Sequence, residues 1–77
     1  MKTLDQLKVG DESVIKSFTD AEISLKLMEM GCIPGEVVKV QQIAPLGCPI
    51  AILVSGSILS MRKTEAAKIE LTEIKTN

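Results

Sequence analysis

The side chains most able to do chemistry are two cysteines, Cys32 and Cys48, because the 77-residue sequence contains no histidine. Zinc and iron sites need several ligands at regular spacings, and beside the thiols only Asp and Glu remain to supply them. The wide separation of the cysteines matches no compact zinc knuckle and no redox pair. We therefore predict no metal site, and we expect two small, buried thiols that stay reduced.

The sequence lacks the combinations of catalytic residues that enzymes commonly use. No histidine can serve as a general base, no serine or cysteine has an imidazole partner, and no Walker-type glycine-rich phosphate loop occurs. The sequence therefore predicts a protein that is not an enzyme and that needs no cofactor.

The charge and the aromatic content also exclude several classes of ligand. The formal net charge is −1, the isoelectric point is about 5.3, and Phe18 is the single aromatic residue. Nucleic-acid backbones require a positive track, single strands require stacking platforms, and grooves for proline-rich peptides are lined with aromatic rings. A protein partner is the remaining expectation, and we predict no binding of nucleic acid.

The segment that best suits binding of a protein partner is APLGCPI, residues 44–50. Two prolines fix φ angles and a glycine permits a turn between them, so this loop is shaped before any partner binds. An equally simple interpretation is a rigid connection that keeps two strands in register. We expect Leu46 at its tip and assign partner binding to Pro45, Leu46, Gly47, Cys48 and Pro49.

One helix is predicted over residues 20–30. Thr19 and Glu22 have the spacing of a capping box at its start, and Gly31 suits the left-handed conformation that ends a helix. At 100° per residue the helix has two apolar stripes. The first comprises Ile23, Leu27 and Met30, and the second comprises Ala21, Leu25 and Met28.

Only one of these stripes is needed for the core of so small a protein. The sequence does not indicate which stripe is exposed. We assign Leu25 and Met28 to a second candidate partner surface because methionine suits adaptable interfaces. Arg62, in the only adjacent basic pair, is the last candidate, and it could meet an acidic patch.

The rest of the chain is typical of short strands. We predict five strands, a three-residue hairpin loop at residues 55–57 and a helical turn at about 64–67. With one small core and one inserted helix, this pattern predicts a mainly β protein with a single domain over 1–77, an SH3-like barrel. Periodicity alone does not separate it from an oligonucleotide-binding fold. The strands are expected at 13–18, 36–43, 50–54, 58–62 and 68–72.

The chain is also expected to be cytoplasmic. Its first residues, MKTLDQLKVGD, lack the apolar core of a signal peptide, and the longest apolar run is Ile50–Val54.

Several blocks together resemble the ferrous-iron transport protein A family, FeoA, over nearly the whole chain. The blocks are the helix end KLMEMG followed by IPG, then APLG with Pro49 and Ile50, then Arg62, Ala66 and Ile69. Members commonly have Asp where this chain has Cys48 and an apolar residue where it has Cys32.

The resemblance implies an SH3-like domain, which also occurs at the C-terminus of some metal-dependent repressors. It further implies an accessory or regulatory protein of bacterial ferrous-iron uptake that binds the cytosolic GTPase region of the FeoB transporter. Such a protein would be peripheral to the membrane only through its partner. The alternatives are a metal-sensing domain and a general SH3-like interaction module, and weak self-association stays open.

Overall fold

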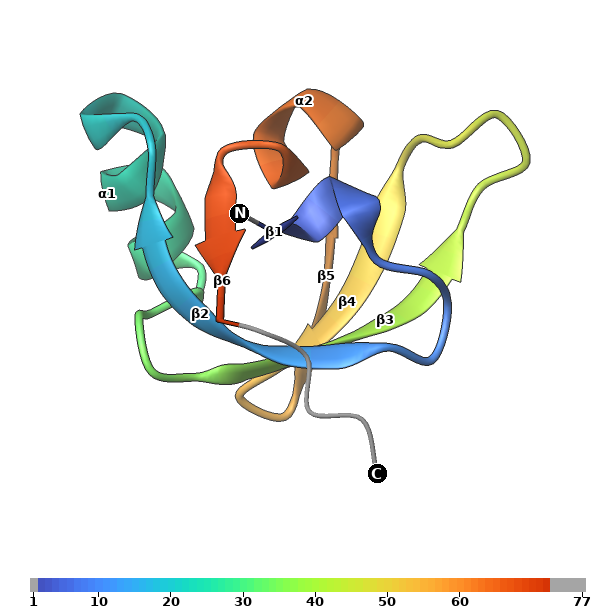
Figure 1. Ribbon diagram of the computed structural model, residues 1–77, viewed down its shortest axis with the longest axis horizontal. Helices are drawn as coiled ribbons and strands as arrows, with labels where there is room; N and C mark the ends of the chain where they lie inside the picture. The colour runs from blue at the N-terminus through green and yellow to red at the C-terminus, as the bar shows by residue number, and fades with distance from the viewer. Residues whose placement is uncertain (1, 73–77) are drawn as a thin grey trace.

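Six short antiparallel strands and two helices make up the computed structural model, which describes residues 2–72 (Figure 1). A 3-10 turn, Leu4–Gln6, follows the first strand. The strands and helices in chain order are β1 (Lys2–Thr3), β2 (Glu12–Phe18), α1 (Ala21–Glu29), β3 (Val37–Ile43), β4 (Ile50–Val54), β5 (Ser57–Met61), α2 (Lys63–Ala66) and β6 (Ile69–Leu71).

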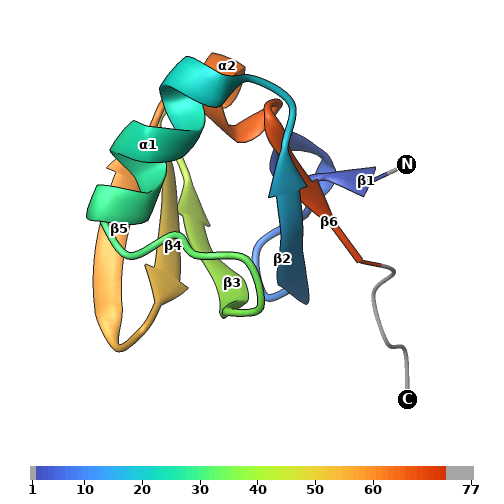
Figure 2. The ribbon, with the colours of Figure 1, turned by 90° about the vertical axis from the view of Figure 1, so that its left-hand side faces the viewer.

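All six strands belong to one sheet with the order β1-β6-β2-β3-β4-β5. The first half of β2 pairs with β3 and its second half pairs with β6. Register shifts between Ile15 and Ser17 and between Val40 and Gln42 interrupt these ladders. Such bulges bend a strand and increase its twist. The sheet is therefore strongly curved, and both helices lie toward the same end of it (Figure 2).

The core fills the concave side of this curved sheet. Strand β4 alternates strictly, with Ile50, Ile52 and Val54 buried. Leu4 and Leu7, from the segment before β2, are also buried. Burying one such side chain contributes about 1.5–3 kcal/mol. Phe18, the single aromatic residue, is only partly buried and packs against this core. The buried apolar residues are Leu4, Leu7, Ile15, Leu27, Cys32, Val38, Val40, Ile50, Ile52, Val54, Met61, Ala66, Ile69 and Leu71.

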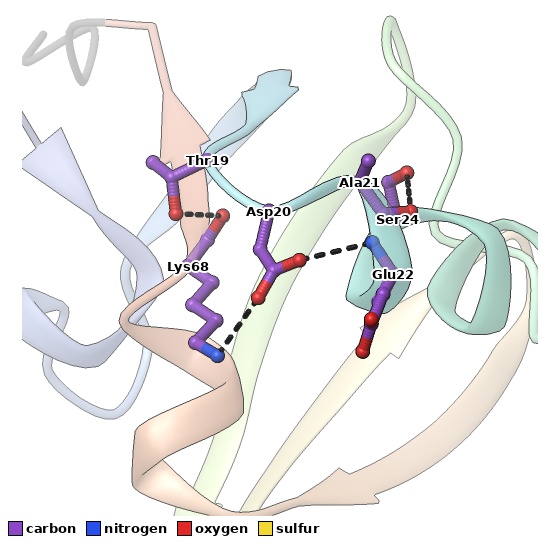
Figure 3. A network of polar contacts seen from close by, with 6 residues as sticks. All are labelled: Thr19, Asp20, Ala21, Glu22, Ser24 and Lys68. Carbon is purple, nitrogen blue, oxygen red and sulfur yellow. Dashed lines mark hydrogen bonds and ion pairs between the residues drawn. The ribbon is translucent and has the colours of Figure 1, made fainter.

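The start of α1 differs from the predicted capping box. Asp20 is the N-cap, and its carboxylate accepts the N–H of Glu22 at 2.9 Å (Figure 3). The Thr19 hydroxyl instead donates to the carbonyl of Lys68 at 3.5 Å, and the Thr19 N–H donates to the same carbonyl at 2.9 Å. Thr19 therefore ties the chain to the residue before β6, and the next polar side chain takes the capping role.

The end of α1 lies where glycine predicts it. Gly31 has a φ of +103°, a conformation that only glycine adopts readily. Met30 shares a stripe with the buried Leu27 but is itself 36% exposed. Met30 is the C-cap residue, and the turn at Gly31 directs the chain away before another residue of that stripe can pack.

The β4–β5 hairpin has a two-residue loop and not the predicted three. Ser57 pairs with Val54 and belongs to β5, so only Ser55 and Gly56 form the turn. Both have positive φ, +52° and +77°. Positive φ at both central residues is the signature of a type I′ turn, whose twist matches that of the flanking strands.

The predicted strands are otherwise found within one or two residues of their predicted bounds, as is the helical turn at 63–66. β1 was not predicted, because two residues are too few to show a period. It exists through its pairing with β6, in which Lys2 lies opposite Leu71.

Candidate partner-binding surface

The proline loop, residues 44–49, is held by its own backbone. The Ala44 N–H donates to the Pro49 carbonyl at 3.1 Å, and the Gly47 N–H donates to the Ala44 carbonyl at 2.7 Å. Gly47 has a φ of +89°, which allows the chain to reverse between the prolines. The Cys48–Pro49 peptide bond is cis. The loop is thus an ordered turn that connects β3 and β4.

Leu46 lies at the tip of this turn with 96% of its surface exposed. Pro45 and Pro49, in the same loop, are also exposed. Among the large apolar side chains of residues 2–72, Leu46 is the most exposed. Such a residue on a rigid loop contributes nothing to the core, so its packing energy is available to a partner.

Cys48 connects the loop to the start of α2. Its Sγ accepts the backbone N–H of Lys63 at 3.3 Å, which places the loop beside the basic pair that begins with Arg62. The expectation of two buried thiols is wrong for Cys48, which is exposed, and correct for Cys32. Burial raises the pKa of the Cys32 thiol, so that thiol is held in its neutral form. Both cysteines are free.

Within residues 2–72, no group of three or more His, Cys, Asp or Glu residues is placed to hold a metal ion. Neither helix in this part of the chain is long and apolar enough to cross a membrane.

The structure shows which stripe of α1 faces outward. Leu27 is fully buried and Ile23 packs against the core, whereas Leu25 is 62% exposed and Met28 is 38% exposed. Ala21 is exposed as well. The face of Ala21, Leu25 and Met28, which we call the outer α1 face, is therefore available for contact.

Two ion pairs fix α1 to the C-terminal part of the fold. Lys68 Nζ lies 3.1 Å from Asp20 Oδ2 (Figure 3), and Lys26 Nζ lies 3.1 Å from Glu65 Oε2. All of these side chains except Glu65 are substantially exposed, so the pairs orient the helix more than they stabilise it.

The carboxylates of these ion pairs have lowered pKa values. For Asp20 the main cause is the hydrogen bond from the Glu22 N–H, followed by Lys68. For Glu65 the main cause is the hydrogen bond that its carboxylate accepts from the Arg62 N–H, followed by Lys26. Each hydrogen bond favours the ionised form.

The predicted residues lie on two separate surfaces, and Arg62 belongs to one of them. Figure 1 shows α1 on the left of the molecule and the proline loop, between β3 and β4, on the right. Arg62 joins the loop surface, through the contact of Cys48 with Lys63, and not the outer α1 face. Sequence spacing could not show this, because the curvature of the sheet decides which loops meet.

Sequence reasoning also missed several exposed apolar residues. Ile58 on β5 is 65% exposed, Val37 on β3 is 53% exposed, and Ile33 after α1 is 48% exposed. Ile58 carried a usable signal, because it alternates with the inward-facing Leu59 and Met61 along β5.

A family model described as the FeoA domain matches residues 2–73. A curated relative from Porphyromonas gingivalis, a fusion of Fe(2+) transport protein A with the Fe(2+) transporter FeoB, is 35% identical over 75 residues. The match covers 96% of this chain but only 9% of that relative.

Solved structures show the same fold. Iron(II) transport protein A from Clostridium thermocellum superimposes with a TM-score of 0.87 at 36% identity, covering 95% of this chain and 45% of that one. FeoA from Stenotrophomonas maltophilia, complexed with zinc and described as a procaryotic SH3 domain protein, gives 0.81 at 26% identity, covering 94% and 91%. These matches confirm the predicted SH3-like fold.

Proposed function

The chain belongs to the FeoA family, which is linked to ferrous-iron transport, and we propose that it is a non-catalytic regulatory subunit that binds a FeoB-type transporter. In this proposal the single domain acts in the cytoplasm, reaches the membrane only through its partner, and carries no cofactor. The contact is made with the cytosolic GTPase region of the transporter.

The fusion in the Porphyromonas gingivalis relative is the observation that carries this proposal. There a segment 35% identical to this chain is part of the same polypeptide as FeoB. Such a linkage raises the effective concentration of one partner at the other, which is useful when the two must meet. A separate chain needs a binding surface in place of the linker.

The proline loop supplies that surface in the proposed complex. Its backbone is already ordered by the hydrogen bonds of Ala44 and Gly47, so little conformational freedom is lost on binding. Leu46 is the anchor, because inserting it into an apolar pocket would remove about 1.5–3 kcal/mol of unfavourable hydration. Arg62, beside the loop, adds a charge at the rim that steers an acidic partner surface.

Substitution of the anchor tests the proposal. Leu46→Asp is expected to weaken binding to the full-length transporter in lipid nanodiscs at least tenfold, measured by biolayer interferometry, because a charge replaces the buried group. The Tm should not change, since Leu46 is 96% exposed.

A matched control is Val9→Asp, which places the same charge on another exposed loop residue, 59% exposed. It should leave the affinity within twofold of the wild-type value. Equal affinities for wild type and Leu46→Asp would overturn the role of the loop, and no binding of wild type would overturn the proposed function.

A further inference from the structure

Strand β5 is the last strand of the sheet, so one of its two edges has no neighbouring strand. Its sequence, SILSM, contains no charge and no proline, and no register shift interrupts its pairing with β4. Exposed edge strands usually carry a charge, a proline or a bulge, because a regular and uncharged edge allows another strand to pair with it. Strand β5 is therefore an edge without protection.

The two-residue turn determines which backbone groups are free on this edge. Val54 and Ser57 flank the turn and form a hydrogen-bonded pair, and in an antiparallel ladder such pairs alternate with non-bonded ones. Leu59 and Met61 therefore also bond to β4. The N–H and C=O groups of Ile58 and Ser60 point away from the sheet, and no other described residue hydrogen-bonds to them.

The side chains along this edge indicate what kind of strand would fit. Ile58 is 65% exposed and lies opposite the half-buried Leu53 on the outer face, so an apolar side chain could cover both. Arg62 and Lys63 follow directly at the C-terminal end of β5, and both are exposed. Among residues 2–72 neither has an acidic partner within 4.0 Å, since the ion pairs there use Lys26 and Lys68.

We propose that the free edge of β5 binds an extended segment of the transporter as an added antiparallel strand, with an acidic residue at the amino-terminal end of that segment. This inference rests on the proposed function. An antiparallel strand places its N-terminus beside the C-terminus of β5, where Arg62 and Lys63 supply complementary positive charge. Its uncharged residues would pair with the backbone of Ile58 and Ser60.

This strand site is continuous with the proline loop. The Lys63 N–H contacts Cys48, and Ile50, the residue after the loop, is the β4 partner of Met61. A segment leaving β5 at its C-terminal end therefore passes close to the loop surface. One partner chain can therefore use both features, with the basic pair between them.

Ser60→Pro tests the proposal, because it removes one outward-facing N–H without removing a bond to β4. Proline is tolerated on an edge strand at such a position. We expect binding to the full-length transporter to weaken at least tenfold. Ser60→Ala keeps the N–H and should bind within twofold of wild type. A folded Ser60→Pro variant that binds as tightly as wild type would overturn the strand site.

Hydrogen exchange of the wild-type complex tests the same point without any substitution. The amides of Ile58 and Ser60 should exchange at least tenfold more slowly when the transporter is bound, whereas Leu59 and Met61 are already bonded within the sheet. Unchanged exchange at Ile58 and Ser60 in a saturated complex would contradict the proposal.

The outcomes separate this proposal from the proposed function. If the wild-type protein does not bind the transporter, the regulatory role itself is overturned. If it binds tightly but the amides of β5 are not protected from hydrogen exchange, only the strand site is overturned. Protection of Ile58 and Ser60 that grows with concentration in the isolated protein would show that a second copy occupies the edge, and would also overturn the transporter segment as its ligand.

Discussion

Two leucines of α1 show how similar side chains obtain opposite roles. Leu27 is completely buried, whereas Leu25, two residues earlier in the same helix, is 62% exposed. A step of two residues rotates the side chain by about 200°, so the two leucines point to nearly opposite sides of the helix. Leu27 therefore supports the fold, and Leu25 is free to contact a partner.

Alanine substitutions should separate these roles. Leu27→Ala is expected to lower the free energy of unfolding by about 2–5 kcal/mol, because it removes buried methyl groups and leaves a cavity. Leu25→Ala should change the free energy of unfolding by less than about 0.5 kcal/mol. Urea denaturation followed by circular dichroism measures both. Similar losses for the two variants would show that Leu25 is not an exposed residue.

At the scale of elements, α1 is held at its N-cap and through its ion pairs. Asp20 caps the helix and also pairs with Lys68, the residue before β6. Glu65 of α2 accepts the Arg62 N–H and pairs with Lys26 of α1. Both carboxylates act only when ionised, so the attachment of the helix depends on pH.

The sign of that dependence follows from the lowered pKa values of Asp20 and Glu65. A group whose pKa is lower in the folded state stabilises the protein above its ordinary pKa, here 3.8 for Asp20 and 4.5 for Glu65. That stabilisation is lost as the pH falls from these values through the folded-state pKa. The melting temperature should therefore decline as the pH is lowered below about 4.5.

Neutral variants provide the control. Asp20→Asn and Glu65→Gln should each reduce the slope of Tm against pH below about 4.5, because the titrating group is gone. Thr19→Ala, which removes the predicted but unused cap, should leave that slope unchanged. An unaltered slope in both carboxylate variants would mean that these ion pairs do not anchor α1.

At the scale of the whole molecule, the proline loop lies apart from the outer α1 face but next to the edge of β5. The outer α1 face and the proline loop lie on different sides (Figure 1). The proline loop and the edge of β5 meet through Cys48, Lys63 and Arg62. A single partner can therefore cover the loop and the β5 edge while the outer α1 face stays open to a second contact.

Much of the fold could be predicted from the sequence, because its signals are local. Gly31 ends the helix, alternation identifies the strands, and the family blocks indicate an SH3-like domain. The N-cap of α1 could not be predicted from the sequence alone, since Thr19 and Asp20 are both good capping residues. Their choice depends on Lys68, which lies far away in the sequence and beside them in the fold.

The shape of the proline loop could be predicted from the sequence, but the arrangement of the residues around it could not. Two prolines around a glycine indicate a shaped loop with Leu46 at its tip. The sequence does not show that Cys48 accepts the N–H of Lys63, nor that Ile58 and Ser60 face an open edge. Both depend on strand order and register, which are set by tertiary packing.

The most direct test of the central claim is an NMR titration of the isotope-labelled protein with the cytosolic GTPase region of the transporter, with and without nucleotide. The proposed contact predicts saturable amide shifts concentrated at residues 44–50 and 58–63. Leu27 and its buried neighbours should remain unshifted. Saturable shifts confined to other parts of the molecule, or no shifts when the transporter region is in excess, would contradict the claim that this protein binds the transporter through its proline loop.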